Sequence, residues 1–315
     1  MRALLWDGTT ARVGDHPEPV RDQQTAVVRV SLAGICNTDL EIVKGYMEFR
    51  GVLGHELVGV VEDGPSEWRG QRVVAEINFG CGQCPLCQRG LQRHCPTRRV
   101  MGIVGADGAF AEKVAVPVGN LHRVPDGVAD EAAVFTEPLA AAFEILEQVH
   151  VQPGMECVVL GDGKLGLLVA QVLFQAGARV LAVGTCTAKL DILRQRGIDT
   201  VMFDCWRGAP ADLVVDATGS SRGFAAAVAA TRARGTVVLK STVADSAQVN
   251  LAPLVINEIT VVGSRCGSFA PALRALQTNS VAVEPLISAR LPLCDAAEAL
   301  HLAASPDVLK VVLRP

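Results

Sequence analysis

Hydrophobic and polar positions alternate in short runs along the first 140 residues, and glycines and prolines separate these runs. Residues 26–33 and 58–62 show the alternation most clearly. A period of two places every second side chain on the same face of a sheet, and the glycines and prolines favour turns. The pattern therefore predicts a compact β-rich domain at the start of the chain.

From about residue 138 the hydrophobic pattern changes to strand–helix units. Apolar runs predict strands at 157–160, 179–183, 212–216, 236–239 and 259–262, and the intervening segments predict helices at 165–176, 188–196 and 223–231. This alternation indicates an α/β fold with a doubly wound parallel sheet. Beyond residue 271 we expect helices at 272–277 and 296–304 and a final strand at 310–313.

The length of the chain agrees with this change of pattern. A chain of 315 residues exceeds the size of most single hydrophobic cores. We therefore expect two domains, a β-rich one over residues 1–138 and an α/β one over residues 139–271.

The composition, with 50% apolar and 20% charged residues, is that of a soluble protein with ordinary cores. The most apolar long segment, 165–183, is interrupted by Gln171, Gln175 and Arg179, so no membrane span is expected. The opening residues lack the basic and apolar regions of a signal peptide, which predicts a cytoplasmic location. A net charge of -4 argues against a nucleic-acid partner.

Fifteen residues of the first domain hold four cysteines in the pattern C-x2-C-x2-C-x7-C, namely Cys81, Cys84, Cys87 and Cys95. This spacing is typical of a closed zinc site, in which four thiolates bind one ion at about 2.3 Å. Two disulfides are the alternative, but a cytoplasmic chain is expected to keep its thiols reduced. We predict a structural zinc. Because four protein ligands leave no open position on the ion, this site by itself predicts no catalysis.

A G-x-G-x-x-G pattern follows the first predicted strand of the second domain and reads Gly161-Asp162-Gly163-Lys164-Leu165-Gly166. Between a strand and a helix, the first glycine makes a tight turn and the second lets the backbone approach a pyrophosphate. The amides at the start of the helix then face the anion. A plain strand-to-helix turn is the alternative. We predict a dinucleotide site that includes all three glycines, Lys164 and Leu165.

The choice between NAD and NADP depends on the end of the second strand of this domain, where an acid would accept from a ribose hydroxyl of NAD. No carboxylate is present at residues 182–186, and Asp191 lies deep in the next helix. Gly184, Thr185 and Lys189 instead offer room, a hydroxyl and a cation for a 2′-phosphate. We expect NADP to be favoured over NAD. The alternative role for Lys189 is that of a solvated helix residue that contacts no cofactor.

A second set of metal-ligand types lies in the first domain, at residues 34–39 (Gly-Ile-Cys-Asn-Thr-Asp) and 54–56 (Gly-His-Glu). The thiolate of Cys36, the imidazole of His55 and the carboxylate of Glu56 are ligands of an open zinc site, which leaves a position for water or a substrate oxygen. Taken singly, they are also explained as a buried thiol, a turn histidine and a surface acid. Their closeness in the sequence favours the metal site.

Five motifs in this order resemble the medium-chain, zinc-dependent alcohol and polyol dehydrogenases. They are Gly-Ile-Cys-Asn-Thr-Asp at 34–39, Gly-His-Glu at 54–56, the four cysteines at 81–95, Glu-Pro-Leu at 137–139 and the glycine pattern at 161–166. The resemblance covers essentially the whole chain. It implies a GroES-like catalytic domain over 1–138, completed by about 272–315, and a Rossmann dinucleotide-binding domain over 139–271. The glutamate at position 137 resembles that of the sorbitol and glucose dehydrogenase branch, whereas the liver-type alcohol dehydrogenases have a cysteine at this position.

The resemblance also implies roles for individual residues. Cys36 and His55 would bind the catalytic zinc, and either Glu56 or Glu137 would complete the ligand set. Asp39 would orient His55, and Thr38 would pass the alcohol proton toward solvent. Cofactor contacts are implied at Thr218, Gly219, Lys240, Ser264, Arg265 and Lys310. For Lys240 and Arg265 a solvated loop charge is the alternative.

The implied reaction is hydride transfer between a secondary alcohol, such as a polyol or sugar, and a nicotinamide cofactor. We expect a catalytic and a structural zinc, a small alcohol or carbonyl substrate, and a homodimer or homotetramer. A zinc-independent double-bond reductase on the same scaffold and a nonenzymatic cofactor-binding protein are the alternatives. The presence of Thr38, Asp39 and the ligand residues argues against both.

Overall fold

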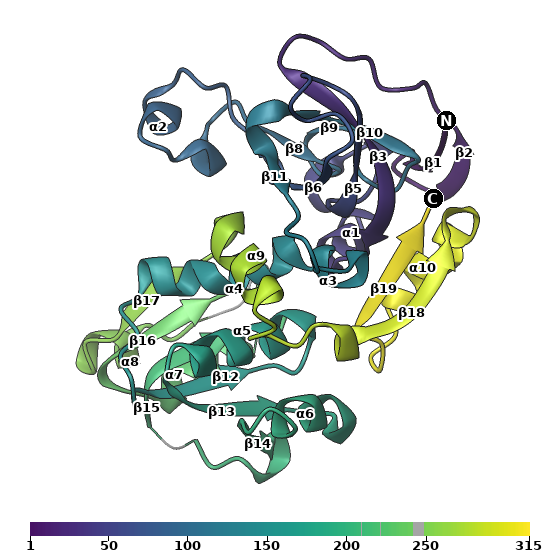
Figure 1. Ribbon diagram of the computed structural model, residues 1–315. Helices are drawn as coiled ribbons and strands as arrows, with labels where there is room; N and C mark the ends of the chain where they lie inside the picture. Colours follow the sequence, from purple (N-terminus) through teal and green to yellow (C-terminus); the bar gives the residue numbers. More distant parts are fainter. Residues whose placement is uncertain (209, 221, 242–248) are drawn as a thin grey trace. The chain divides into compact units, whose positions relative to one another are not determined.

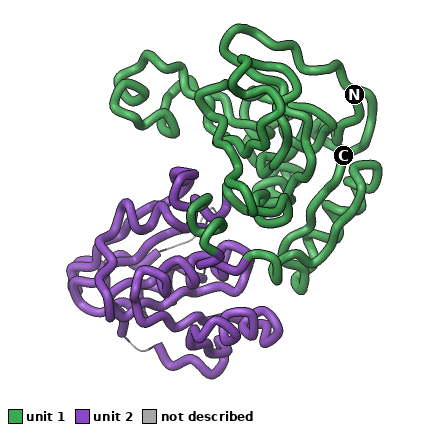
Figure 2. Tube along the Cα trace, viewed as in Figure 1, with its two compact units in different colours: residues 1–137, 272–278, 283–315 green, residues 138–271, 279–282 purple. Residues whose placement is uncertain are grey.

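The computed structural model describes residues 1–208, 210–220, 222–241 and 249–315, and the chain forms two compact units (Figure 2). Unit 1 consists of Met1–Glu137, Ala272–Thr278 and Val283–Pro315, and unit 2 consists of Pro138–Pro271 and Asn279–Ala282. The C-terminal part of the chain thus returns to the unit in which the chain began.

Unit 1 is built mainly from short strands (Figure 1). Its strands are β1 (Arg2–Trp6), β2 (Ala11–Asp15), β3 (Thr25–Gly34), β4 (Gly51–Val52), β5 (Glu56–Asp63), β6 (Arg72–Ala75), β7 (Asn78–Phe79), β8 (Arg99–Met101), β9 (Gly105–Ala106), β10 (Lys113–Pro117), β11 (Leu121–Arg123), β18 (Ile287–Pro292) and β19 (Lys310–Arg314). Its helices are α1 (Asn37–Ile42), α2 (Pro85–Gln88), α3 (Asp130–Ala133), α10 (Ala296–Ala303) and most of α9 (Phe269–Gln277). Single 3-10 turns lie at Tyr46–Glu48, Gln92–His94, Val118–Asn120, Glu284–Leu286 and Leu293–Asp295.

The main sheet of unit 1 has the order β11-β6-β5-β3-β19-β18, and β10 also pairs with β3. β3 lies at its centre because its β-branched residues bury both faces along much of the strand. Gly34, at the end of β3, lies opposite Glu56 of β5 and opposite Val312 of β19. Three segments far apart in the sequence therefore meet at one end of β3.

Unit 2 contains a six-stranded sheet in which every strand pair is parallel, in the order β14-β13-β12-β15-β16-β17. Its elements are α4 (Thr136–Gln148), which begins in unit 1, β12 (Glu156–Leu160), α5 (Lys164–Gln175), β13 (Arg179–Gly184), α6 (Thr187–Arg194), β14 (Asp199–Met202), a 3-10 turn at Phe203–Cys205, β15 (Ala211–Asp216), α7 (Gly223–Ala230), β16 (Thr231–Leu239), α8 (Ala252–Ile256) and β17 (Thr260–Gly263). The strand order reverses between β12 and β15, as in doubly wound dinucleotide-binding sheets. The predicted fold class is confirmed.

Some elements lie outside the sequence prediction. α4, β14 and β18 were not predicted, and β16 begins at Thr231 rather than at residue 236. β18 was missed because its residues are alternately half-buried and exposed, so it has no continuous apolar run. Within the described residues, none of the helices combines the length and the apolar character needed to cross a membrane.

Candidate metal centre and cofactor loop

The end of β3 brings Cys36 and His55 together. Cys36 follows β3 and precedes α1, and His55 directly precedes β5. Because Gly34 lies opposite Glu56 in the antiparallel pair β3–β5, the segment that follows β3 lies beside the segment that precedes β5. The ligand atoms of Cys36, His55 and Glu56 all lie within 4.8 Å of one another. The structure thus assembles a thiol, an imidazole and a carboxylate at one point.

Glu56 has the environment that fits a cation most clearly. Its side chain is fully buried, and Oε1 has no hydrogen-bond partner among the described residues. A buried acceptor without a partner costs about 1–3 kcal/mol, and more if it is charged. A metal ion held by Cys36, His55 and Glu56 would satisfy this oxygen, and the three donor types suit zinc. His55 is buried and Cys36 is partly exposed.

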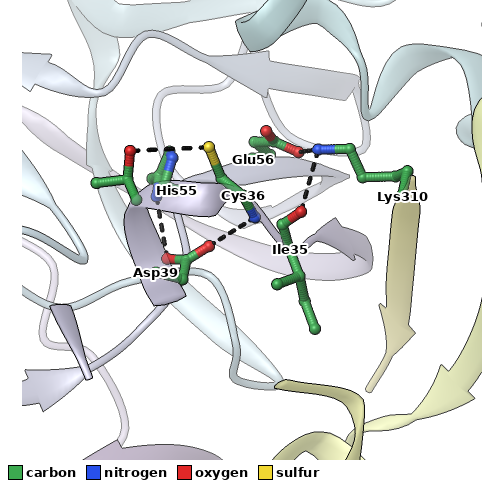
Figure 3. A network of polar contacts seen from close by, with 7 residues as sticks. Ile35, Cys36, Asp39, His55, Glu56 and Lys310 are labelled. Carbon is green, nitrogen blue, oxygen red and sulfur yellow. Dashed lines mark hydrogen bonds and ion pairs between the residues drawn. The ribbon is translucent and has the colours of Figure 1, made fainter. Parts of the chain in front are cut away.

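Asp39 holds His55 and the turn at Cys36 (Figure 3). Asp39 Oδ1 lies 3.2 Å from His55 Nδ1, and Oδ2 accepts the backbone N–H of Cys36 at 2.8 Å. Because a carboxylate only accepts, His55 Nδ1 carries a proton and the other ring nitrogen remains for a metal. Burial by itself would lower the pKa of His55, but the charges of Asp39 and Cys36 and their hydrogen bonds raise it well above its usual value. The same negative charges favour a bound metal cation.

Lys310 is the buried partner of Glu56 (Figure 3). Its Nζ pairs with Glu56 Oε2 and donates to the carbonyl oxygen of Ile35 at 3.3 Å. The ammonium also lies 5.5 Å from the centre of the Phe135 ring. Both charged side chains have 0% exposure. The structure thus places this ammonium against Glu56, and the implied contact of Lys310 with the cofactor pyrophosphate stays a prediction.

Two further residues of the implied catalytic set are Thr38 and Glu137. Thr38 Oγ1 is 3.8 Å from Cys36 Sγ, so its hydroxyl borders the group. Glu137, in the first turn of α4, does not belong to the cluster formed by Cys36, His55 and Glu56 among the described residues. Of the two alternative carboxylates, the structure brings Glu56 to the thiol and the imidazole.

The four cysteines of the 81–95 segment gather around α2, in a loop that extends from the rest of unit 1 (Figure 1). The sulfurs of Cys81, Cys84, Cys87 and Cys95 lie within 4.8 Å of one another. All ten cysteines of the chain lie among the described residues, and none of them is in a disulfide. Backbone amides point at these sulfurs, from Cys81 to Cys95 Sγ at 3.4 Å and from Cys84 to Cys81 Sγ at 3.4 Å.

Hydrogen bonds make part of this thiol cluster acidic. The Thr97 hydroxyl and the Cys81 amide lower the pKa of Cys95 to about 6. Hydrogen bonds from the backbone of Gln83 and Cys84 lower the pKa of Cys81, whereas desolvation raises the pKa of Cys87 to about 11. Thiolates are the metal-binding form of cysteine. A cluster that stabilises the thiolates of Cys81 and Cys95 and holds four sulfurs together fits a closed zinc site.

The glycine pattern forms the turn between β12 and α5. Gly161 has a φ of 112°, and a Cβ there would lie 2.5 Å from the carbonyl oxygen of Ala217. A Cβ on Gly166 would lie 2.0 Å from the carbonyl oxygen of Gly161. Next to Gly163, in contrast, a Cβ would meet no atom within 4 Å. Lys164 and Leu165 begin α5, so the open space at Gly163 adjoins the amides of a helix start, as a pyrophosphate requires.

Asp162, inside this pattern, was not singled out from the sequence. Its Oδ2 accepts the backbone N–H groups of Thr185 and Cys186, both at 2.7 Å. The room that we expected over Gly184 for a 2′-phosphate is occupied, since a Cβ on Gly184 would lie 2.6 Å from Asp162 Oδ2. This corrects the reason for expecting NADP at Gly184 and Thr185. Lys189 lies on α6, half-buried.

The remaining expected cofactor residues surround the carboxyl ends of β15, β16 and β17. Thr218 and Gly219 are exposed; the Thr218 hydroxyl donates to Asp216 Oδ1 at 2.8 Å, and the Gly219 amide donates to the Ser241 hydroxyl at 2.8 Å. Lys240 is buried, which corrects the solvated loop charge considered for it, and its contact with the cofactor stays a prediction. Its Nζ donates to the Ala141 carbonyl at 2.6 Å, the Ser264 hydroxyl at 3.2 Å and the Arg265 carbonyl at 2.8 Å. Lys240 therefore ties β16 to α4 and to the loop after β17.

Comparison with known proteins gives the class. The family model for the alcohol dehydrogenase GroES-like domain matches residues 22–126, and the family model for zinc-binding dehydrogenases matches residues 165–278. The chain belongs to the zinc-dependent medium-chain alcohol and polyol dehydrogenases, which transfer hydride between an alcohol and a nicotinamide cofactor.

Similar proteins extend over the whole chain. A sorbitol dehydrogenase of Halalkalibacterium halodurans is 29% identical, covering 96% of this chain and 95% of the relative. Alcohol dehydrogenase TADH from Thermus sp. ATN1 has a TM-score of 0.91 at 28% identity, covering 100% of this chain and 99% of that one. A zinc-binding dehydrogenase from Sinorhizobium meliloti 1021, solved with NADP, has a TM-score of 0.91 at 26% identity over 100% of this chain and 99% of that one.

Proposed function

We propose that the chain interconverts a secondary alcohol and its carbonyl, using a nicotinamide cofactor and a zinc ion held by Cys36, His55 and Glu56. The observation that supports the site is the convergence of three ligand types within 4.8 Å, one of them a buried carboxylate whose Oε1 lacks a partner among the described residues. Zinc at this point would supply Lewis acidity, which lowers the pKa of a bound alcohol and polarises a carbonyl.

The residues of the chain have separate tasks in this proposal. Asp39 fixes the protonation of His55 Nδ1 and the backbone at Cys36. Thr38, whose hydroxyl borders the partly exposed Cys36, takes the proton of the alcohol and passes it toward solvent. Glu137 remains the alternative carboxylate ligand, from the first turn of α4. A second zinc, bound by the four cysteines, holds the 81–95 loop.

A polyol, sugar or sugar-acid alcohol is the proposed substrate class. The support comes from the relatives, since a D-arabinitol dehydrogenase of Uromyces fabae and an L-galactonate-5-dehydrogenase of Escherichia coli are each 28% identical to the chain. The carboxylate ligands in place of an additional thiolate also make the metal site harder and more labile. Glu137, which resembles the glutamate of the sorbitol and glucose dehydrogenase branch, supports the same substrate class.

The test is a panel of polyols, sugar acids and simple secondary alcohols with NAD and with NADP, read as formation of the reduced nicotinamide. The proposal expects turnover of at least one secondary alcohol and its loss when a chelator removes zinc. A double-bond reductase would instead reduce an activated alkene after chelation and leave every alcohol untouched. Cofactor binding without turnover of any substrate would indicate the nonenzymatic alternative.

We also propose that two copies of the chain associate through the β17 edge of unit 2. β17 ends the sheet, and the adjoining α8 exposes Val255 to 76% and Ile256 to 77%. An open sheet edge beside exposed apolar side chains is a typical pairing surface for a second copy.

A lobe of reduced thiols is stable in reducing compartments, which supports the expected cytoplasmic location.

A further inference from the structure

Asp162 places a negative charge at the end of the second strand of unit 2, although it belongs to the glycine turn after the first. β12 and β13 are neighbouring parallel strands, so the turn after β12 lies beside the end of β13 (Figure 1). From this turn the Asp162 side chain reaches across to Thr185 and Cys186, and its Oδ2 accepts both backbone amides at 2.7 Å.

The neighbouring backbone is shaped to receive this carboxylate. Gly184 is buried, and a Cβ at this position would lie 2.5 Å from Asp162 Cβ and 2.6 Å from Asp162 Oδ2. Any other residue at 184 would push the carboxylate away from the two amides. Two separate features, a pair of hydrogen bonds and a glycine with no room for a side chain, therefore hold Asp162 in this place.

The position of the Asp162 carboxylate is important because a dinucleotide binds beside it in a doubly wound sheet. The pyrophosphate of a dinucleotide lies at the glycine turn, and the adenosine ribose lies at the end of the second strand. Successive backbone amides after a strand form a natural anion site, so the amides of Thr185 and Cys186 are suited to a 2′-phosphate. Asp162 already occupies both amides and adds a negative charge of its own, whereas its other oxygen can accept from a ribose hydroxyl.

We propose that Asp162 is the residue that selects the cofactor: it accepts the ribose hydroxyl of NAD(H) and excludes the 2′-phosphate of NADP(H). The carboxylate missing from residues 182–186 is thus supplied by the glycine turn. This inference rests on the proposed function and replaces the expectation, drawn from Gly184, Thr185 and Lys189, that NADP is favoured.

Isothermal titration calorimetry with ADP-ribose and with 2′-phospho-ADP-ribose tests the selection without any turnover. The unaltered protein should bind ADP-ribose at least about tenfold more tightly, the factor expected from one charge-assisted hydrogen bond. Asp162→Ser should lower this preference at least about tenfold, mainly by gaining affinity for the 2′-phosphate. Asp162→Asn, which keeps the acceptor for both amides and loses the charge, should fall between the two proteins.

Lys189→Ala is the matched control, because it removes the nearby α6 cation and leaves Asp162 in place. It should leave the preference for ADP-ribose intact. Tighter binding of 2′-phospho-ADP-ribose by the unaltered protein, or an unchanged preference in both folded Asp162 variants, would overturn the inference while leaving the proposed function standing. Failure of both probes to bind the unaltered protein would overturn the cofactor site itself, and the inference with it.

Discussion

Lys310 and Glu56 form a fully buried ion pair, although 254 residues separate them in the sequence. β3 lies between β5 and β19 in the sheet and brings their ends together. Lys310 pairs with Oε2 of Glu56, Oε1 has no hydrogen-bond partner among the described residues, and the carboxylate belongs to the group with Cys36 and His55. The charge of Glu56 is thus shared between a fixed internal cation and the proposed metal position.

Replacing Lys310 by methionine should destabilise the protein by about 3–5 kcal/mol, because it leaves the Glu56 carboxylate buried without its counter-charge. Urea unfolding followed by circular dichroism measures the loss. The double variant Glu56→Gln/Lys310→Met is the control and should recover most of the stability. A Lys310→Met protein as stable as the unaltered one would contradict the importance of this pair.

Gly34→Ala should also destabilise unit 1, because the added Cβ would lie 2.3 Å from Glu56 Oε2. Crowding of this kind in a packed core costs about 1–3 kcal/mol. Gly119→Ala is a matched control, since a Cβ at Gly119 would meet no atom within 4 Å. Equal unfolding midpoints for the two variants would show that Glu56 moves away without cost.

Asp39→Asn should weaken zinc binding at Cys36 and His55 about 10- to 100-fold, the usual effect of losing a carboxylate that orients a ligand histidine. Competition with a chromophoric chelator measures the affinity. The zinc of the four-cysteine lobe serves as the internal control and should be retained. If both zinc ions keep their affinity, Asp39 does not orient a metal ligand.

Cys84→Ala and Cys36→Ala should affect the protein differently. Cys84→Ala removes a ligand of the closed site and should lower the melting temperature and the solubility, because that site stabilises the fold. Cys36→Ala should remove activity and leave the protein folded. Thermal melting of the two variants measures the difference, and equal melting behaviour would refute this separation of roles.

Replacing both Val255 and Ile256 by glutamate should convert a dimer into a monomer, because charges would face each other across the β17 edge. Size-exclusion chromatography with light scattering reads the mass. Val20→Glu, at a valine that is 88% exposed in unit 1, is the control for added surface charge. A double variant that keeps its dimeric mass would place the interface elsewhere.

The sequence predicted the elements and motifs that are local. The end of β3 and the start of β5 are nineteen residues apart at Cys36 and His55, and their apolar alternation predicted both strands. The four cysteines and the glycine turn are each complete within a short segment, so the spacing of their residues and the predicted strand and helix beside the glycines indicated them.

The contacts that could not be predicted from the sequence depend on which strands pair in the sheets and on the direction in which each side chain points. Lys310 reads as a basic residue of a final strand, and only the pairing of β19 with β3 shows that it is buried against Glu56. In the sequence Asp162 is an ordinary turn residue, and only the pairing of β12 with β13 brings the amides of Thr185 and Cys186, which follow β13, to its carboxylate. Lys240 reads as a loop cation because the carbonyls that surround its ammonium lie about 25 and 99 residues away in the chain.

The zinc content of the protein, measured together with hydride transfer, tests the central claim most directly. We predict two zinc ions per chain in the active protein, and in Cys36→Ala one zinc ion with no hydride transfer to the nicotinamide. One zinc ion per chain in both proteins, with alcohol oxidation unchanged by Cys36→Ala, would contradict a catalytic metal at Cys36, His55 and Glu56.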